Sequence, residues 1–164
     1  ARFQGFSEES FAYLRAIYDS ELAYDDEHFG RLSDWMRSNG LLDKTLLVIT
    51  ADHGEVLGEH FTLGHEYTLF KPAVHIPLIL RYPNAIKPAK MEQCVSNVDV
   101  FPTVLNLAGY ADKIPSDISG VNILNQPPEA HRPLLCSNMH RGGQFSLLDN
   151  DFKLIFDRFG FVKE

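Results

Sequence analysis

The sequence is poor in cysteine, has no excess of positive charge and has no long apolar run, and these absences exclude whole classes of protein. Its 164 residues contain 15 lysines and arginines against 22 aspartates and glutamates, a formal net charge of -7. Because no basic stripe is visible, a nucleic-acid-binding role is excluded. The apolar runs are far shorter than the roughly 20 residues that a membrane helix needs, so no transmembrane segment is expected. The two cysteines, Cys94 and Cys136, can pair or stay free, and their spacing does not decide between these states.

The length and composition fit a single core domain. Hydrophobic residues make up 45% and charged residues 23% of the chain, as is ordinary for a globular protein, and 164 residues are enough for one core and not for two. The chain opens directly into a helical pattern and ends at residues 161–164 on a strand-like run with no stop signal. We therefore expect it to be a fragment of a longer protein.

A long amphipathic helix is predicted near the start of the chain. Apolar or aromatic residues recur there in steps of three or four, as they do on one face of a helix. Ser7 is a candidate N-cap, and Asn39 and Gly40 form a stop signal. The pattern predicts a helix over residues 7–38, followed by a short connector and a strand. Helix, tight turn and strand in this order are typical of α/β proteins.

The stretch of residues 45–82 carries most of the residues that can do chemistry. It begins with an apolar run at 45–50, which is typical of a strand buried on both faces in a parallel sheet. Asp52, His53 and Gly54 follow directly. Open α/β sheets bind their ligands just beyond the carboxyl ends of the strands, so this Asp and this His lie where such a fold places its site.

Asp52 and His53 are candidate metal ligands. A carboxylate oxygen and an imidazole nitrogen both bind divalent cations. Neighbouring side chains on a strand point to opposite faces, so two ligands in a row require a bend, and Gly54 helps to supply one. In the alternative interpretation, Asp52 caps the following segment and His53 is a polar surface residue. Four residues alone do not decide between the two.

The rest of the chain predicts further α/β elements and a small sheet. Residues 59–71 read as an irregular loop and 77–82 as a second buried strand. Asp99 is a candidate N-cap for a helix that ends at Gly109, and we expect it to be a cap and not a catalyst. The remaining expected elements are a short strand at 92–95, a polar surface connection at 111–133, and antiparallel strands at 133–138, 144–148 and 152–156 with a turn at 149–151.

The motifs of residues 50–83 resemble those of one enzyme family. The string Thr-Ala-Asp-His-Gly-Glu-x-Leu-Gly-Glu-His is followed by Gly-His, by Thr-Leu-Phe and by His-Ile-Pro-Leu-Ile-Leu-Arg-Tyr-Pro. This pattern, with its intervals, is similar to that of the sulfatase family of the alkaline phosphatase superfamily. The resemblance implies an α/β fold containing part of an alkaline-phosphatase-like sheet flanked by helices. Residues 1–125 would be the C-terminal half of that domain, and residues 126–164 the start of a small antiparallel C-terminal subdomain.

The resemblance also implies a mechanism, of which this chain holds one half. Sulfatases cleave sulfate esters with a divalent metal, usually calcium, and with a formylglycine nucleophile made in a Cys/Ser-x-Pro/Ala-x-Arg motif. That motif and the N-terminal acidic metal ligands are absent here, so the nucleophile is expected outside this chain and the fragment alone is expected to be inactive. Asp52 and His53 match the metal ligands. His65 matches the position of a catalytic Lys or His that holds a sulfate oxygen.

One departure from the family pattern leaves alternatives open. Most arylsulfatases have Asp-Asn-Gly where this chain has Asp52, His53 and Gly54. Asp-His-Gly is commoner in relatives that cleave phosphonate and phosphodiester bonds, and imidazole admits manganese or zinc better than calcium. The alternatives are a phosphonate or phosphodiester hydrolase acting on a phosphate-ester substrate, a phosphoryl transferase, or a non-catalytic sulfatase-like domain. Family members are often exported, periplasmic or lysosomal, and the sequence specifies no oligomeric state.

Overall fold

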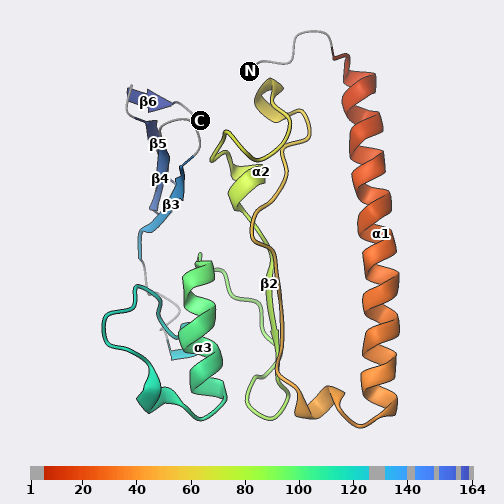
Figure 1. The fold of residues 1–164 in the computed structure, drawn as a ribbon, viewed down its shortest axis with the longest axis vertical. Helices are drawn as coiled ribbons and strands as arrows, with labels where there is room; N and C mark the ends of the chain where they lie inside the picture. The colour runs from red at the N-terminus through yellow and green to blue at the C-terminus, as the bar shows by residue number, and fades with distance from the viewer. Residues whose placement is uncertain (1–5, 126–131, 140–142, 150–151, 158–159, 163–164) are drawn as a thin grey trace. The chain divides into compact units, whose positions relative to one another are not determined.

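The chain forms two compact units, residues 1–86 and residues 87–164 (Figure 1). The computed structural model describes residues 6–125, 132–139, 143–149, 152–157 and 160–162. Among these residues, no helix has the length and apolar character that a membrane span requires. The domain boundary expected at residues 125 and 126 stays a prediction.

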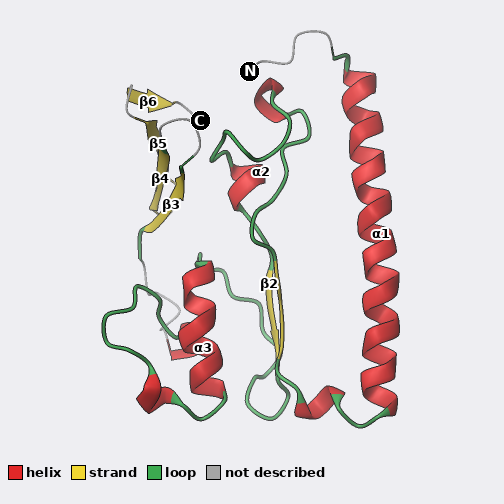
Figure 2. Cartoon of the chain, in the orientation of Figure 1, coloured by secondary structure: helices red, strands yellow, loops and turns green. Residues whose placement is uncertain are grey.

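The first unit begins with the long helix that the sequence predicts. Helix α1 spans Glu8–Ser38 (Figure 2). The side chain of Ser7 accepts a hydrogen bond from the backbone N–H of Ser10 at 3.2 Å. This N-cap satisfies one of the free N–H groups of the first turn. The chain leaves the helix through Gly40, whose φ of 65° is a conformation that glycine adopts without strain. The predicted bounds and both end signals are confirmed.

The apolar stripe of α1 is buried only near the two ends of the helix. Phe11 and Met36 are its buried members, whereas Leu22 is 50% exposed and Leu32 is 49% exposed. The periodicity correctly predicted the helix. An amphipathic stripe usually indicates a buried face, but no described residue covers the middle of this stripe.

Two short strands follow, and they pair with each other. Strand β1 spans Leu47–Thr50 and strand β2 spans Leu78–Arg81; they run antiparallel, with Val48 opposite Leu80. The run at 45–50 was expected to be buried on both faces, as in a parallel sheet, and 77–82 to be a second buried strand; both expectations are wrong for the described chain. Both strands are largely half-exposed, because the two form a two-stranded sheet on their own and nothing in the described residues covers both faces.

The turn before β1 is tied to the end of β2. A 3-10 turn, η1, spans Leu42–Lys44. The guanidinium group of Arg81 donates to the carbonyl of Leu42 at 2.7 Å and to the carboxylate of Asp43 at 2.6 Å. These contacts fix the start of β1 beside the end of β2. Between the strands lie only the 3-10 turn η2, Glu59–Phe61, and the four-residue helix α2, Lys71–Val74, so the predicted loop at 59–71 is confirmed.

The second unit contains a short helix with a buried carboxylate at its start. The 3-10 turn η3, Asn97–Asp99, leads into helix α3, Val100–Leu107. Asp99 is fully buried. Its carboxylate accepts from the backbone N–H of Ser96 at 2.8 Å, as the third residue of a capping box in which Ser96 is the N-cap. Asp99 directly precedes α3, as predicted, but its side chain makes no N-cap hydrogen bond to that helix. The short strand predicted at 92–95 is wrong: this segment is irregular, because a strand of that length is not stable without paired neighbours.

The segment after α3 packs back onto the helix instead of only crossing the surface. The Asp99 carboxylate also accepts from the backbone N–H of Val121 at 2.9 Å and from Arg132 at 2.5 Å. Ile123 is 4% exposed, and its N–H donates to the buried hydroxyl of Thr103 at 3.2 Å. The turns η4, Ala111–Lys113, and η5, Ile123–Asn125, lie in this segment. Most of the described residues of this segment are exposed, as its polar composition predicts. Val121 and Ile123 are among the exceptions, because Asp99 and Thr103 hold their backbone N–H groups.

The chain ends in the antiparallel sheet that the sequence predicts. Strands β3, Leu134–Asn138, β4, Gln144–Asp149, β5, Phe152–Asp157, and β6, Gly160–Val162, pair in the order β3-β4-β5-β6. The first three match the predicted strands, and β6 is an addition. The turn predicted at 149–151 lies partly outside the described residues. Cys94 and Cys136 are both free thiols, which decides the question that their spacing left open.

Candidate metal and anion site

The Asp-His-Gly motif lies directly after β1, where the chain turns along helix α2. The backbone N–H of Gly54 donates to the carbonyl of Ala73 at 2.8 Å. A Cβ atom at Gly54 would lie 2.1 Å from the carbonyl oxygen of Pro72, a separation that no packed structure tolerates. The glycine is therefore required for space, because it lets the backbone of α2 approach the end of the strand.

Asp52 and His53 face each other across the bend. The Nδ1 atom of His53 lies 2.9 Å from the carbonyl oxygen of Gly54, so this nitrogen carries the proton and donates it. The lone pair is then on Nε2, which lies 3.7 Å from Oδ2 of Asp52. The other carboxylate oxygen of Asp52 accepts from the backbone N–H of His53 at 3.0 Å. Asp52 thus makes a local backbone contact and also directs an oxygen toward the free nitrogen of its neighbour.

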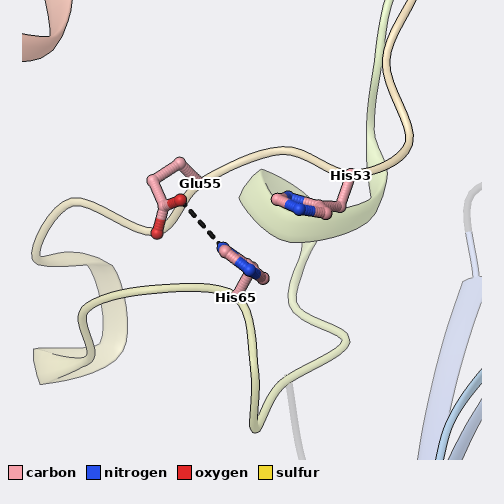
Figure 3. A group of neighbouring side chains, drawn as sticks. All are labelled: His53, Glu55 and His65. Carbon is pink, nitrogen blue, oxygen red and sulfur yellow. Dashed lines mark hydrogen bonds and ion pairs between the residues drawn. The ribbon is translucent and has the colours of Figure 1, made fainter.

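His65 joins this pair from the far side of the loop. Its imidazole ring stacks on that of His53, with centroids 3.6 Å apart and planes inclined by 22°. Its Nδ1 lies 2.9 Å from Oε2 of Glu55 (Figure 3). One ligand atom from each of His53, Glu55 and His65 lies within 4.8 Å of the others. All of these groups are partly exposed and therefore accessible to a ligand.

The loop is built so that residue 55 meets residue 65. Leu57 and Leu63 form an antiparallel bridge, and hydrogen bonds join Gly58 to Thr62 and Gly64 to Val56, each at 3.0 Å. Gly58 and Gly64 have φ values of 117° and 84°, which a residue with a Cβ rarely adopts. The turn therefore depends on glycine at both positions.

Helix α1 supports the loop from behind. A Cβ atom at Gly58 would lie 2.6 Å from the ring of Phe11, so the glycine lets the loop pack directly on this buried aromatic. Arg15 donates to the carbonyl of Leu57 at 3.2 Å. An open pocket of about 290 Å³ lies between the helix and the two arms of the loop. It is lined by Leu14, Ile17, Tyr18, Glu21, Glu55, Val56, Leu57, Leu63 and Gly64.

The structure brings together the three residues that the sequence singled out and adds a fourth. His53 and His65 are stacked, and Asp52 lies beside His53. Glu55 was not singled out, although it is two residues beyond His53. The signal that could have identified it is the glycine pair Gly58 and Gly64, which marks a tight hairpin-like turn between residues 55 and 65.

Comparison with known proteins gives a consistent family. A family model described as Sulfatase matches residues 1–110. Arylsulfatase K of Bos taurus is 29% identical to this chain, over 92% of this chain and 30% of that protein. The N-acetylglucosamine-6-O-sulfatase of Bacteroides thetaiotaomicron is 39% identical, over 68% of this chain and 19% of that protein.

A solved structure shows the same fold. Phosphonate monoester hydrolase SpPMH from Silicibacter pomeroyi superimposes with a TM-score of 0.81 at 27% sequence identity, covering 94% of this chain and 35% of that one. The chain thus spans only 19–35% of the length of these three proteins. Similarity of this extent identifies a family and a fold, and it leaves most of each relative outside the comparison.

Proposed function

This chain belongs to the sulfatase family, and from that membership we propose that it supplies half of the active site of a sulfatase-like hydrolase. Asp52 and His53 would hold a divalent metal ion, and His65 would hold the sulfate group of a sulfate ester. The family model over residues 1–110 and the solved relative confirm the family and the alkaline-phosphatase-like α/β fold that the sequence predicts. The residue roles and the activity of the complete enzyme are the proposal.

The arrangement of Asp52 and His53 carries the metal assignment. Metal-bound histidines commonly donate their second ring nitrogen to a carbonyl or carboxylate group, which fixes the tautomer. His53 does so through Nδ1 and Gly54, which leaves the lone pair of Nε2 for a metal. The 3.7 Å between Nε2 and the Asp52 oxygen suits two ligands that each lie about 2.0–2.4 Å from one ion. The residues present therefore fit a divalent cation.

The identity of the metal follows from the donor set only in part. A carboxylate and an imidazole accept calcium, manganese or zinc, and family membership favours calcium. When bound, the ion would neutralise charge on the sulfate group and on the nucleophile. The two ligands of this chain do not complete a coordination sphere, so the remaining ligands would come from other parts of the enzyme.

His65 is the group in this chain that would contact the sulfate. When protonated, an imidazole beside an oxyanion is a charge-assisted donor, and donors placed where negative charge develops are a major source of catalysis. The stack on His53 places the ring of His65 next to the metal ligands. A sulfate oxygen that meets the metal would therefore lie within reach of His65.

A second candidate function has its own support. His53 replaces the asparagine of most arylsulfatases, and the solved relative described above is a phosphonate monoester hydrolase. Sulfate and phosphonate esters share tetrahedral geometry and negatively charged oxygens, so the same metal and histidine groups suit both. A phosphonate or phosphodiester hydrolase is therefore the alternative.

The complete protein that contains this chain is the material for the test. We expect Asp52→Ala and His53→Ala to lower the bound divalent metal and the turnover of an aryl sulfate about 100-fold or more. The matched control is Asp34→Ala, because Asp34 lies on the exposed face of α1 in an ion pair with Arg37. Unchanged metal content in both site variants would refute the ligand assignment.

Substrate comparison decides between the candidates. Faster turnover of an aryl sulfate than of an aryl phosphonate or phosphodiester supports the sulfatase, and the reverse order supports the alternative. If the complete protein binds the metal and turns over none of these esters, the domain is a non-catalytic relative. The 164-residue chain lacks the nucleophile motif, so we expect it to show no turnover under the same conditions.

A further inference from the structure

We propose that Glu55 is a positioning residue that fixes which ring nitrogen His65 presents to the substrate. The proposal rests on the function proposed above, in which His65 contacts the sulfate group. Glu55 does not touch the substrate in this scheme. It acts through its hydrogen bond to Nδ1 of His65, at 2.9 Å.

The backbone of the loop sets up this contact before any ligand arrives. The bridge between Leu57 and Leu63 and the hydrogen bonds on either side of it define an antiparallel register. The ladder does not continue past this isolated bridge, because Gly64, with a φ of 84°, bends the chain between Leu63 and His65. The bridge nevertheless holds the two arms of the loop together, and the carboxylate of Glu55 meets the ring of His65 at 2.9 Å. The backbone of the loop therefore places this contact.

Two contacts constrain the ring of His65 in different ways. The stack on His53 sets the plane of the ring. A ring turned by half a revolution about its Cβ–Cγ bond keeps that plane and exchanges Nδ1 with a carbon, so stacking alone does not select one orientation. The carboxylate of Glu55 selects one of these two ring orientations, because it accepts a hydrogen bond from Nδ1–H and none of comparable strength from a ring carbon. With Nδ1–H engaged, Nε2 is the nitrogen that remains, and in the protonated ring its N–H donates to a substrate oxygen.

The geometry also distinguishes this role from that of a third metal ligand. His53, Glu55 and His65 lie close enough to suggest a three-ligand site. An imidazole lone pair, however, lies in the plane of its ring. The rings of His53 and His65 are stacked 3.6 Å apart with planes only 22° from parallel, so a single ion cannot lie well in both planes. The carboxylate of Glu55 therefore serves His65, and the measurement of metal content below tests this assignment.

The experiment is a double-mutant cycle in the complete enzyme, with an aryl sulfate as substrate. We expect Glu55→Ala to lower kcat about 10- to 100-fold, as is typical when a partner that orients an active-site histidine is removed, with a smaller change in KM. In a His65→Ala background the same change should lower kcat less than twofold, because the residue through which Glu55 acts is gone. Glu55→Gln should restore most of the loss, because its amide oxygen can still accept from Nδ1–H.

Two further measurements separate positioning from other roles. Metal content should stay at the wild-type value in Glu55→Ala. The ¹⁵N chemical shifts of His65 should report a protonated Nδ1 in the wild type and a mixture of tautomers in Glu55→Ala. The matched control is Glu59→Gln, which alters a carboxylate in the same loop that contacts the backbone of Leu57; its kcat should be unchanged.

Three outcomes would overturn the inference. They are a wild-type kcat in Glu55→Ala, an equal loss in the presence and absence of His65, and a loss of metal in Glu55→Ala. The second would indicate a structural role for the loop carboxylate, and the third a metal ligand. Failure of the proposed function looks different: the wild-type enzyme itself would turn over no ester. The ¹⁵N measurement would then still support or refute the pairing of Glu55 with the His65 ring.

Discussion

Replacing Gly54 by alanine adds a single methyl group, and the structure predicts that this change damages the candidate site. The new Cβ atom would lie 2.1 Å from the carbonyl oxygen of Pro72 and 3.2 Å from its carbonyl carbon. Ordinary contact begins at 3.4 Å, so the strand end and helix α2 must separate by more than an ångström. The obstacle is backbone and not the end of a flexible side chain, so a change of rotamer cannot relieve it.

The magnitude follows from two effects. Forcing a methyl group into a filled space costs about 1–3 kcal/mol. Separation also stretches the hydrogen bond from Gly54 to Ala73, now 2.8 Å, whose loss adds about 1 kcal/mol. We therefore expect Gly54→Ala to lower the free energy of unfolding by about 2–4 kcal/mol. Because Asp52 and His53 precede this glycine directly, we also expect weaker metal binding.

Gly30 provides a control, because the same replacement by alanine is expected there to raise the free energy of unfolding instead of lowering it. It lies within helix α1, and a Cβ atom there meets nothing within 4 Å. Gly30→Ala should stabilise the protein by about 0.5–1 kcal/mol, because alanine loses less backbone entropy in a helix. Urea unfolding of both variants, together with a metal titration, makes the comparison. The reasoning is refuted if Gly54→Ala unfolds at the wild-type urea concentration, or if both variants shift in the same direction.

Two further changes test the contacts that hold each unit together. Asp99→Asn should lower the free energy of unfolding by about 3 kcal/mol, because it leaves Arg132 beside a buried neutral group, and it should accelerate hydrogen exchange at the Val121 amide. The control Asp34→Asn, in an exposed ion pair, should change the free energy of unfolding by about 0.5 kcal/mol or less. Equal effects of the two changes would contradict this prediction. Arg81→Met should lower the free energy of unfolding, measured with urea, by about 1–2 kcal/mol, because it removes the hydrogen bonds to Leu42 and Asp43. If Arg81→Lys unfolds at the same urea concentration as the wild type, the pair of hydrogen bonds made by the guanidinium group is not required for stability.

The elements that the sequence predicted well are those whose signals are local. The periodic stripe, the Ser7 cap and the Gly40 stop that define helix α1 all lie within the helix or no more than two residues beyond its ends. The C-terminal strands are likewise marked by their own alternation and turns. In both cases the information lies within one element or one turn, so it can be read without knowledge of the neighbours.

The predictions that failed concern what surrounds an element. The run at 45–50 was expected to be buried on both faces because it is continuously apolar, yet within the described residues β1 pairs with β2 alone and stays half-exposed. The segment 111–133 was expected on the surface because it is polar, and most of its described residues are exposed; the exception that composition could not show is Ile123, which is buried and donates its N–H to Thr103. Composition describes the segment, whereas burial depends on partners far away in the sequence.

The candidate site shows the same limit at the scale of single residues. Asp52, His53 and His65 could be singled out because their side chains bind metals and anions. Glu55 has such a side chain too, but its role depends on the residue opposite to it.

That pairing is set by residues with no side chain at all. Gly58 and Gly64 adopt φ values that close the loop, and Gly58 also packs against Phe11. Moving either glycine by one position would place a side chain at a positive φ and disturb the turn that brings Glu55 to His65. The chemistry of this site thus depends on ligand side chains, which can be recognised in the sequence, and on a loop conformation, which is seen only in the structure. A search for related sites should therefore look for the spacing of the glycines as well as for the ligands.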